Sequence, residues 1–393
     1  MRNAQRAVTV VCLSAACFAW PARAQWADSV GIYHWGGRLN LSASDGVNLI
    51  ANMGGHVARL VLSPLYYSEY GGGTGCYPDF SLAALVQEPD IQHALDDQRI
   101  KTFILTAYDG VSFGDCSTLR FLNPRFYTAT NLAAMQAEYR DFVLRLFQRY
   151  AGSGRHFVIS NWESDNAVYC NAMSEYVSDP AFRLQCDSNY PAYYDGNRNI
   201  FDSLDGLRLW LEARDAGIAE GVRVAQEQGL GGLEVAHAPE INSVRLLESN
   251  GFPSVLQYVL SRLHFNSVSY SAYEAANANR PATALTEDIR TIRAVTGADK
   301  VIIGEVGYSR SVWQDAAATR LRAFVEAAIA CGVQYLISWN LNDQDAEFDF
   351  GAFDSAGDIT PTGRLLETMF EQPALRLSAP HSLRPRSTSR IEE

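Results

Sequence analysis

Residues 301–308 read VIIGEVGY, a short apolar run that is rich in β-branched residues and ends in a glutamate. Residues 156–165 read HFVISNWESD and repeat this pattern, with Glu163 in the polar end. Short apolar runs bounded by polar residues are typical of buried β-strands. Each run is followed by a polar segment and then by an amphipathic helical pattern, so we predict two strands that each lead into a helix.

The same unit recurs along the chain. The β-rich runs are Val30–Trp35, His56–Leu62, Lys101–Ala107, His156–Ser160, Leu233–Ala238, Ser267–Tyr273, Val301–Val306 and Tyr335–Trp339. Helical patterns between them include Leu132–Tyr150, Leu204–Gln228, Ser243–Leu263, Thr286–Thr296 and Ala316–Cys331. Alternating strands and helices of this number predict an α/β fold, a single (β/α)8 TIM barrel with long βα loops over residues 25–376. A doubly wound open sheet is the alternative, but no strand leads into a GxGxxG turn, and the glycines of residues 71–75 are expected in a loop.

The two ends of the chain are expected to lie outside this barrel. Residues 1–24 combine two early arginines, an apolar stretch and a final Ala-Arg-Ala, which is the pattern of a bacterial-type signal peptide. We therefore expect a secreted or periplasmic protein, and a buried N-terminal helix is the alternative. No later run is long and apolar enough to suggest stable membrane insertion. Residues 377–393 are rich in Ser, Arg and Pro and predict a disordered tail.

Cysteine positions agree with export. Cys331 ends a helical pattern and is expected to be a buried free thiol. Four others lie in polar connections, where an oxidising compartment favours disulfides; they are Cys76, Cys116, Cys170 and Cys186. Three pairings are possible, of which we favour Cys170–Cys186 and Cys76–Cys116. Zinc binding is the competing interpretation, but the sequence has no CxxC pair to support it.

Composition narrows the class of partner. The chain has 393 residues, 47% of them hydrophobic, and a formal net charge of −12, so a nucleic-acid-binding surface is not expected. Lys101 and Lys300 lie at strand starts, the wrong end of a barrel for Schiff-base chemistry, and His34 stands alone on the first strand. We therefore expect no metal or other cofactor, and a monomer that acts on a small or polymeric neutral substrate.

Polar residues follow several of the predicted strands, where barrel active sites form. Glu163 ends the fourth strand and Glu305 ends the seventh. A carboxyl group after an apolar strand is costly unless it faces a polar cavity or a partner, so these two are expected to face each other across the barrel mouth. Two facing carboxyl groups are what glycoside hydrolysis requires. A structural salt bridge at each strand end is the other interpretation.

Aromatic residues near the same ends fit a carbohydrate ligand. Trp35, Trp162 and Trp339 could stack on sugar faces. His34 and His237 could bind sugar hydroxyls, although a structural role is equally compatible with their positions.

The joint order of these residues resembles the retaining glycoside hydrolases of clan A, the (β/α)8 families that include cellulases, β-mannanases, β-galactosidases and β-xylosidases. Members carry an Asn-Glu pair after strand four and a glutamate after strand seven, which Asn161…Glu163 and Glu305 resemble. The strand-two arginine of the clan matches Arg59, and its strand-eight tryptophan matches Trp339. The resemblance covers essentially the whole chain after the signal peptide, through short motifs in a specific order.

This resemblance implies a double displacement with Glu163 as acid/base and Glu305 as nucleophile, their carboxyl groups about 5–5.5 Å apart. It also implies that Arg59 and Tyr273 lower the pKa of Glu305, while Tyr270 points to the other face of its strand. Burial and the second carboxylate would keep Glu163 protonated. Asn161 would hydrogen-bond the sugar 2-hydroxyl.

Two departures from the clan pattern stand out. Trp162 separates Asn161 from Glu163, and a one-residue bulge there would be needed to return both side chains to the cavity. Without such a bulge, Asp165 becomes a rival acid. Ser271 stands where many members carry a histidine, so the sequence indicates the clan and no individual family. A carbohydrate-binding barrel with relic glutamates is the remaining functional alternative.

Overall fold

The computed structural model describes residues 26–70, 75–77, 79–113, 120–193, 199–345 and 348–372. The predicted signal peptide and C-terminal tail lie outside these residues, as does Cys116.

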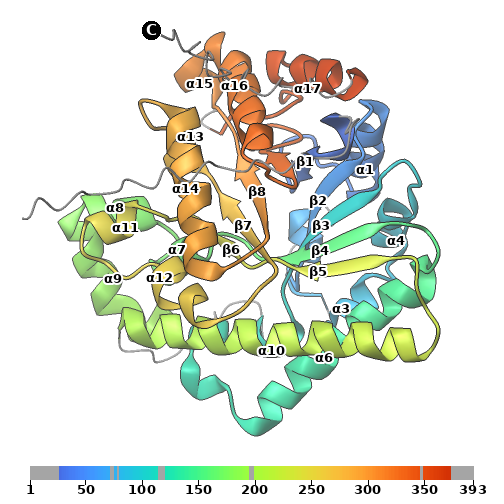
Figure 1. The fold of residues 1–393 in the computed structure, drawn as a ribbon, viewed down its shortest axis with the longest axis vertical. Helices are drawn as coiled ribbons and strands as arrows, with labels where there is room; N and C mark the ends of the chain where they lie inside the picture. Colours follow the sequence, from blue (N-terminus) through green and yellow to red (C-terminus); the bar gives the residue numbers. More distant parts are fainter. Residues whose placement is uncertain are drawn as a thin grey trace, which may run out of the picture.

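A single sheet of parallel strands forms the centre of the molecule (Figure 1), with the order β5-β4-β3-β2-β1-β9-β8-β7-β6. The strands are β1 (Val30–His34), β2 (Val57–Leu62), β3 (Thr102–Ala107), β4 (His156–Ser160), β5 (Glu234–His237), β6 (Glu240–Ile241), β7 (Ser267–Ser271), β8 (Lys300–Val306) and β9 (Leu336–Ser338). Every predicted β-run contains a strand whose ends fall within two residues of the prediction.

The fifth position of the barrel holds two short strands, because β5 lies within the predicted run Leu233–Ala238 and β6 lies just beyond its end. β5 pairs with β4, whereas β6 pairs with β7, and only Ala238 and Pro239 separate the two strands. The backbone NH of Ala238 donates to the carbonyl of Ile159, and the carbonyl of Pro239 accepts from the NH of Ser269. This one segment therefore bridges both ends of the sheet order and closes it, and the (β/α)8 barrel is confirmed.

Helices cover the outside of the barrel (Figure 1). One main helix or helical segment follows each barrel strand: α1 (Ala43–Asn52), α4 (Pro89–Asp96), α6 (Ala129–Tyr150), α10 (Ile200–Glu227), α12 (Val255–Tyr258), α14 (Pro281–Thr296), α16 (Ala316–Ala330) and α17 (Pro361–Glu371). α10 packs along α6, at the bottom of Figure 1. None of the described helices has the length and apolar character that crossing a membrane requires.

Two predictions for helices and loops were wrong. Residues 243–263 do not form one helix but two short ones, α11 (Leu246–Ser249) and α12, followed by a 3-10 turn over Leu260–Arg262. Pro253 lies between them and cannot continue a helix, and the hydroxyl of Ser254 caps α12. The connection after the fourth predicted strand, expected as one of the long βα loops, contains α7 (Ser164–Val168), α8 (Met173–Ser178) and α9 (Pro180–Tyr193).

The predicted Cys170–Cys186 disulfide is present, with Cα atoms 6.1 Å apart, and it connects the segment before α8 to α9. Cys76 is also disulfide-bonded, and its predicted partner lies outside the described residues. Cys331 is a free thiol, as expected, but it is only half-buried.

Strand alternation divides the core into two layers. On β2, Ala58, Leu60 and Leu62 pack outward against the helices, while Val57 and Val61 pack inside the barrel. Arg59 lies between Val57 and Val61, and its side chain is fully buried. The barrel interior therefore holds a buried cation beneath the strand ends.

Candidate active site

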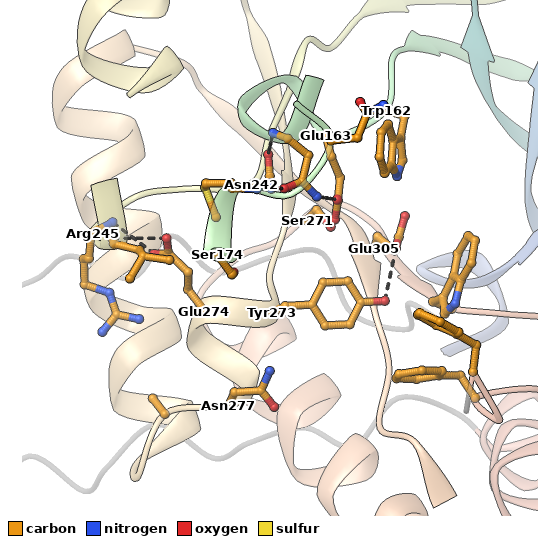
Figure 2. A pocket seen from close by; sticks show the side chains of 18 of the residues that line it. Trp162, Glu163, Ser174, Asn242, Arg245, Ser271, Tyr273, Glu274, Asn277 and Glu305 are labelled. Carbon is orange, nitrogen blue, oxygen red and sulfur yellow. Dashed lines mark hydrogen bonds between the residues drawn. The ribbon is translucent and has the colours of Figure 1, made fainter. Parts of the chain in front are cut away.

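A cavity of about 990 Å³ opens at the carboxyl ends of the strands. Glu163 and Glu305 both line it, although they are 142 positions apart in the sequence. Figure 2 shows their carboxyl groups turned toward the same space. The predicted residues Trp35, Trp162, Tyr273 and Trp339 line the cavity as well.

A bulge in β8 aims Glu305 into this cavity. Tyr270 of β7 pairs with Ile303, but Ser271 pairs with Glu305, so Gly304 is skipped. Both Gly304 and Glu305 therefore face inward, as residues at a β-bulge can. Residue 304 must be small, because a Cβ there would overlap the carboxylate of Glu240. The sequence predicted a bulge around Trp162, but the bulge lies in β8, the seventh predicted strand.

Glu163 reaches the cavity without a bulge. The pairing of β4 with β3 and β5 is regular to the end of β4, and residues 161–163 form the turn into α7. Ser271 Oγ donates to Glu163 Oε1 at 2.5 Å, and Asn166 Nδ2 donates to Oε2. Two neutral donors thus hold both carboxyl oxygens (Figure 2). The sequence did not single out Asn166, and Ser271 appeared only as a departure from the clan pattern.

Asn161 does not line the cavity, so the expected contact with a sugar 2-hydroxyl is not supported. Its Oδ1 accepts from the backbone NH of Glu240 at 3.1 Å, and its Nδ2 donates to Ser164 Oγ at 2.9 Å. The side chain is buried, and both ends of its amide are used within the protein. Asn161 therefore anchors the turn after β4 to β6.

Asp165, the rival acid, is also placed away from the cavity lining. Its carboxylate accepts from the backbone NH groups of Asn242 at 3.0 Å and Val255 at 2.8 Å, and from that of Ser243. Burial raises the pKa of Asp165 to about 6, although these hydrogen bonds lower it. The residue joins the loop after β4 to the loop after β6.

A third buried carboxylate lies beneath the two glutamates, and the sequence analysis missed it. Arg59 binds Glu240 through two contacts, Nη1 to Oε2 at 2.8 Å and Nη2 to Oε1 at 3.0 Å, and both side chains are fully buried. Arg59 also donates from Nε to Thr106 Oγ1 at 2.9 Å and from Nη1 to the carbonyl of Gly304 at 2.7 Å. Arg59 does not contact Glu305 directly, because Glu240 and these acceptors occupy the guanidinium, but its charge lowers the pKa of Glu305 as expected. Glu240 follows the fifth apolar run just as Glu163 follows the fourth, and that signal could have identified it.

We expect Arg59→Met to destabilise the fold by about 3–5 kcal/mol, because it leaves the Glu240 carboxylate buried without its cation. Guanidinium denaturation of the single variants and of Arg59→Met/Glu240→Gln measures this effect. The double variant should recover part of the loss. A single-variant cost below about 1 kcal/mol would contradict a buried ion pair at this place.

The pKa of Glu305 is shifted in the direction opposite to the expectation. Burial and then the charge of Glu163 raise its pKa well above the usual range, while Arg59 and the hydroxyl of Tyr273 act in the opposite direction. Tyr273 donates to Oε1 at 3.0 Å, and Oε2 has no hydrogen-bond partner among the described residues. Burial, and to a smaller extent Glu240, also raises the pKa of Glu163, to about 7. Two carboxyl groups that interact in this way titrate as a pair.

Aromatic rings form one wall of the cavity. The rings of Trp35 and Trp339 lie 5.5 Å apart, and Trp339 also meets Tyr33 edge-on at 5.0 Å. Phe348 and Phe350 extend the wall, with Phe350 6.5 Å from Tyr273. Tyr270 points away from the cavity, as expected from strand alternation, and donates to Asp288.

His237 does not line the cavity, so its predicted contact with substrate is not supported. Its Nδ1 lies 2.9 Å from Asp215 of α10, and its ring packs edge-on against Phe265. The side chain points outward from β5 because alternation directs it to the helix layer. His34 is likewise buried, with its Nε2 2.8 Å from the carbonyl of Ser42. Within the described ranges, no group of three or more His, Cys, Asp or Glu residues could hold a metal ion.

No protein-family model and no curated protein matches the chain. Several solved structures match it. A GH5_18 protein from Streptomyces cattleya in complex with GlcNAc matches with a TM-score of 0.54 at 14% identity, covering 89% of this chain and 80% of that one. A GH5_18 protein from Bifidobacterium longum subsp. longum matches with a TM-score of 0.53 at 14% identity, covering 87% and 78%. A structure described as beta-glucosidase 1317 matches with a TM-score of 0.54 at 14% identity, covering 83% and 86%. At these identities the likeness shows a shared fold.

Proposed function

We propose that the protein is an exported retaining β-glycoside hydrolase that acts on an oligo- or polysaccharide. One observation carries the proposal: the carboxyl groups of Glu163 and Glu305 come from opposite parts of the barrel sheet and line one cavity. Both carboxyl groups are buried, and the charge of Glu163 raises the pKa of Glu305. Retaining glycosidases use such a pair.

In the first step, Glu305 Oε2 attacks the anomeric carbon of the substrate. The bond to the leaving oxygen breaks, and Glu163 transfers its proton to that oxygen. In the second step, Glu163 takes a proton from water, which attacks the anomeric carbon and breaks its bond to Glu305. Two inversions restore the β configuration, and Glu163 ends protonated again.

The contacts of each carboxyl group support these roles. Glu305 Oε2 is buried without a partner among the described residues, while Tyr273 holds Oε1, so one oxygen is oriented and the other is available. Burial and the charge of Glu163 raise the pKa of Glu305, and Arg59 and Tyr273 oppose this shift, so these two residues favour the ionised state that a nucleophile needs. Glu163 has a pKa raised to about 7, close to the value that suits a group that must both donate and accept a proton.

The cavity walls support a carbohydrate substrate. Trp35 and Trp339 offer flat apolar rings in the cavity that Glu305 lines, and other lining residues carry amides and hydroxyls. Sugars have apolar faces and polar edges, so a site of this composition suits them. The descriptions of the matching structures name a β-glucosidase and a GlcNAc complex, which makes β-glucosides and GlcNAc-containing disaccharides reasonable first probes.

The test is a screen of the purified protein over aryl β-glycosides, β-glucans, β-mannans, xylans and GlcNAc-containing disaccharides. Proton NMR of the first product then reports its anomeric configuration. We expect hydrolysis of at least one class, with the β-anomer formed first. Formation of the α-anomer first would exclude the double displacement. Saturable binding of a saccharide without any turnover would instead support a non-catalytic carbohydrate-binding barrel.

A further inference from the structure

The cavity has two chemically different halves. The aromatic half consists of Trp35, Trp339, Phe348 and Phe350, from the loops after β1 and β9. The polar half comes from the loops after β4, β6 and β7, and its principal members are Ser174, Asn242, Arg245, Ser249 and Asn277. Trp162 also comes from the loop after β4 and lies beside Glu163 (Figure 2). Apart from Trp162 and Tyr273 at its border, the described lining residues of the polar half carry no aromatic ring, and Met173, Leu246 and Ala278 are its apolar members.

The two glutamates are distributed unequally between these halves. Glu163 is held by Asn166 and Ser271, and the backbone NH of Asn166 donates to Asn242 Oδ1, so the proposed acid belongs to the polar half. Glu305 is held by Tyr273, whose ring lies beside Phe350 of the aromatic half. The acid must lie next to the leaving oxygen, and the nucleophile must lie under the sugar that it attacks. The polar half is therefore on the side of the leaving group.

Arg245 lies at the outer end of the polar half. Figure 2 shows it at the opposite side of the view from Glu305, with Asn242 and Ser174 between them. Its side chain is 41% exposed, and it is held by Asp288, with Nε 2.8 Å from Oδ1. Asp288 is almost fully buried and also accepts from Tyr270, which keeps the guanidinium in place.

The nearby carboxylate of Glu274 does not compete for this guanidinium. It accepts from Ser243 Oγ at 2.7 Å and from the backbone NH groups of Val244, Arg245 and Leu246. These donors, which lie just before α11 and at its first residue, occupy both carboxylate oxygens of Glu274. The guanidinium thus presents hydrogen-bond donors at the outer end of a wall that otherwise binds through amides and hydroxyls.

We infer that the polar half binds a leaving group that is itself a chain of at least two sugar residues, and that Arg245 contacts the second of them. The inference rests on the proposed function. A cavity of about 990 Å³ has room for more than one sugar ring. A sugar next to Glu163 meets Asn242 and Ser174 first, and the oxygen atoms of the next sugar are the acceptors within reach of the guanidinium. Beyond Trp162 and Tyr273, the hydrogen-bonding groups of this wall favour hydrophilic sugars over aryl or lipid leaving groups.

The test compares two leaving groups on the same sugar. The substrates are p-nitrophenyl β-D-glucoside with cellotriose, or p-nitrophenyl β-D-mannoside with mannotriose, according to which glycoside the protein cleaves. Oxygen-18 at the reducing end of the trisaccharide lets mass spectrometry count the events that release a labelled disaccharide. We expect Arg245→Met to lower kcat/KM for this release by about tenfold, the effect of losing a hydrogen bond from a charged donor, and to leave kcat/KM for the aryl glycoside within about twofold.

Arg322→Met is the matched control, because Arg322 is 44% exposed and paired with Glu326 on α16, outside the cavity. It should change neither value. An equal loss on both substrates in Arg245→Met would mean that Arg245 only supports the structure and would overturn the inference, as would no loss on either. A wild-type protein that cleaves neither substrate class and nothing else in the screen would overturn the proposed function and this inference with it.

Discussion

Glu305→Gln is expected to lower kcat/KM by on the order of 10⁴-fold or more, because it removes the only atom proposed to form a covalent bond with the substrate. Gln is close to Glu in size and can still meet the hydroxyl of Tyr273, so the cavity should keep its shape. Steady-state hydrolysis of the best aryl glycoside measures the loss, and circular dichroism with thermal unfolding reports on the fold.

The matched control is Glu326→Gln, which removes an exposed carboxylate on α16. Glu305→Ala with added azide provides a second readout, since azide can occupy the space of the lost carboxyl group and attack the anomeric carbon from the same side. We expect an α-glycosyl azide. A β-glycosyl azide, or activity of Glu305→Gln close to wild type, would reject Glu305 as the nucleophile.

Glu163→Ala should lower kcat/KM for oligosaccharides by about 10²–10⁴-fold, the typical contribution of a general acid. For dinitrophenyl glycosides, kcat/KM should fall less, because the leaving oxygen of these substrates hardly needs a proton. In the wild type, Glu163 must be protonated to act as the acid. Since its pKa is raised to about 7, kcat/KM should fall as the pH rises through that value. The variant should lose this basic limb.

Asp165→Asn tests the rival acid. Asp165 accepts three backbone hydrogen bonds, so the variant should be less stable but should keep the basic limb of the pH profile. Azide added to Glu163→Ala should yield a β-glycosyl azide, the opposite configuration to that expected from Glu305→Ala. If Asp165→Asn lost the basic limb of the pH profile and Glu163→Ala kept it, Asp165 would be the acid in place of Glu163.

Strand positions were predictable because they depend on local pattern. Each apolar run lies between polar connections, and all eight runs contain a strand. The short strand β6, which follows the fifth run, was not predictable, because a strand of two residues carries no periodic signal. The helix expected over residues 243–263 failed for a local reason that was visible in the sequence, since Pro253 interrupts it.

The residues of the candidate site were also predictable only in part. Glu163 and Glu305 were identified because a carboxyl group after a buried strand needs a polar environment, and both line the cavity. Asn161 and His237 also lie at strand ends, but their side chains bind other groups of the protein and do not line the cavity. Glu240 satisfies the same criterion as the two glutamates and was overlooked.

The sequence by itself determined the barrel class, the strand ends and the identity of the two facing carboxyl groups, because apolar periodicity and the cost of burying charge act within short segments. Only the tertiary structure decided which side chains face the cavity. The bulge at Gly304 turns Glu305 inward, and the turn after β4 turns Asn161 under the cavity while it presents Glu163 to it. The tertiary structure also decided the partner of Arg59, since Glu240 reaches it only when β2 and β6 meet inside the closed barrel. Side-chain direction beyond the last residue of a strand depends on contacts between segments distant in sequence, and no local pattern encodes it.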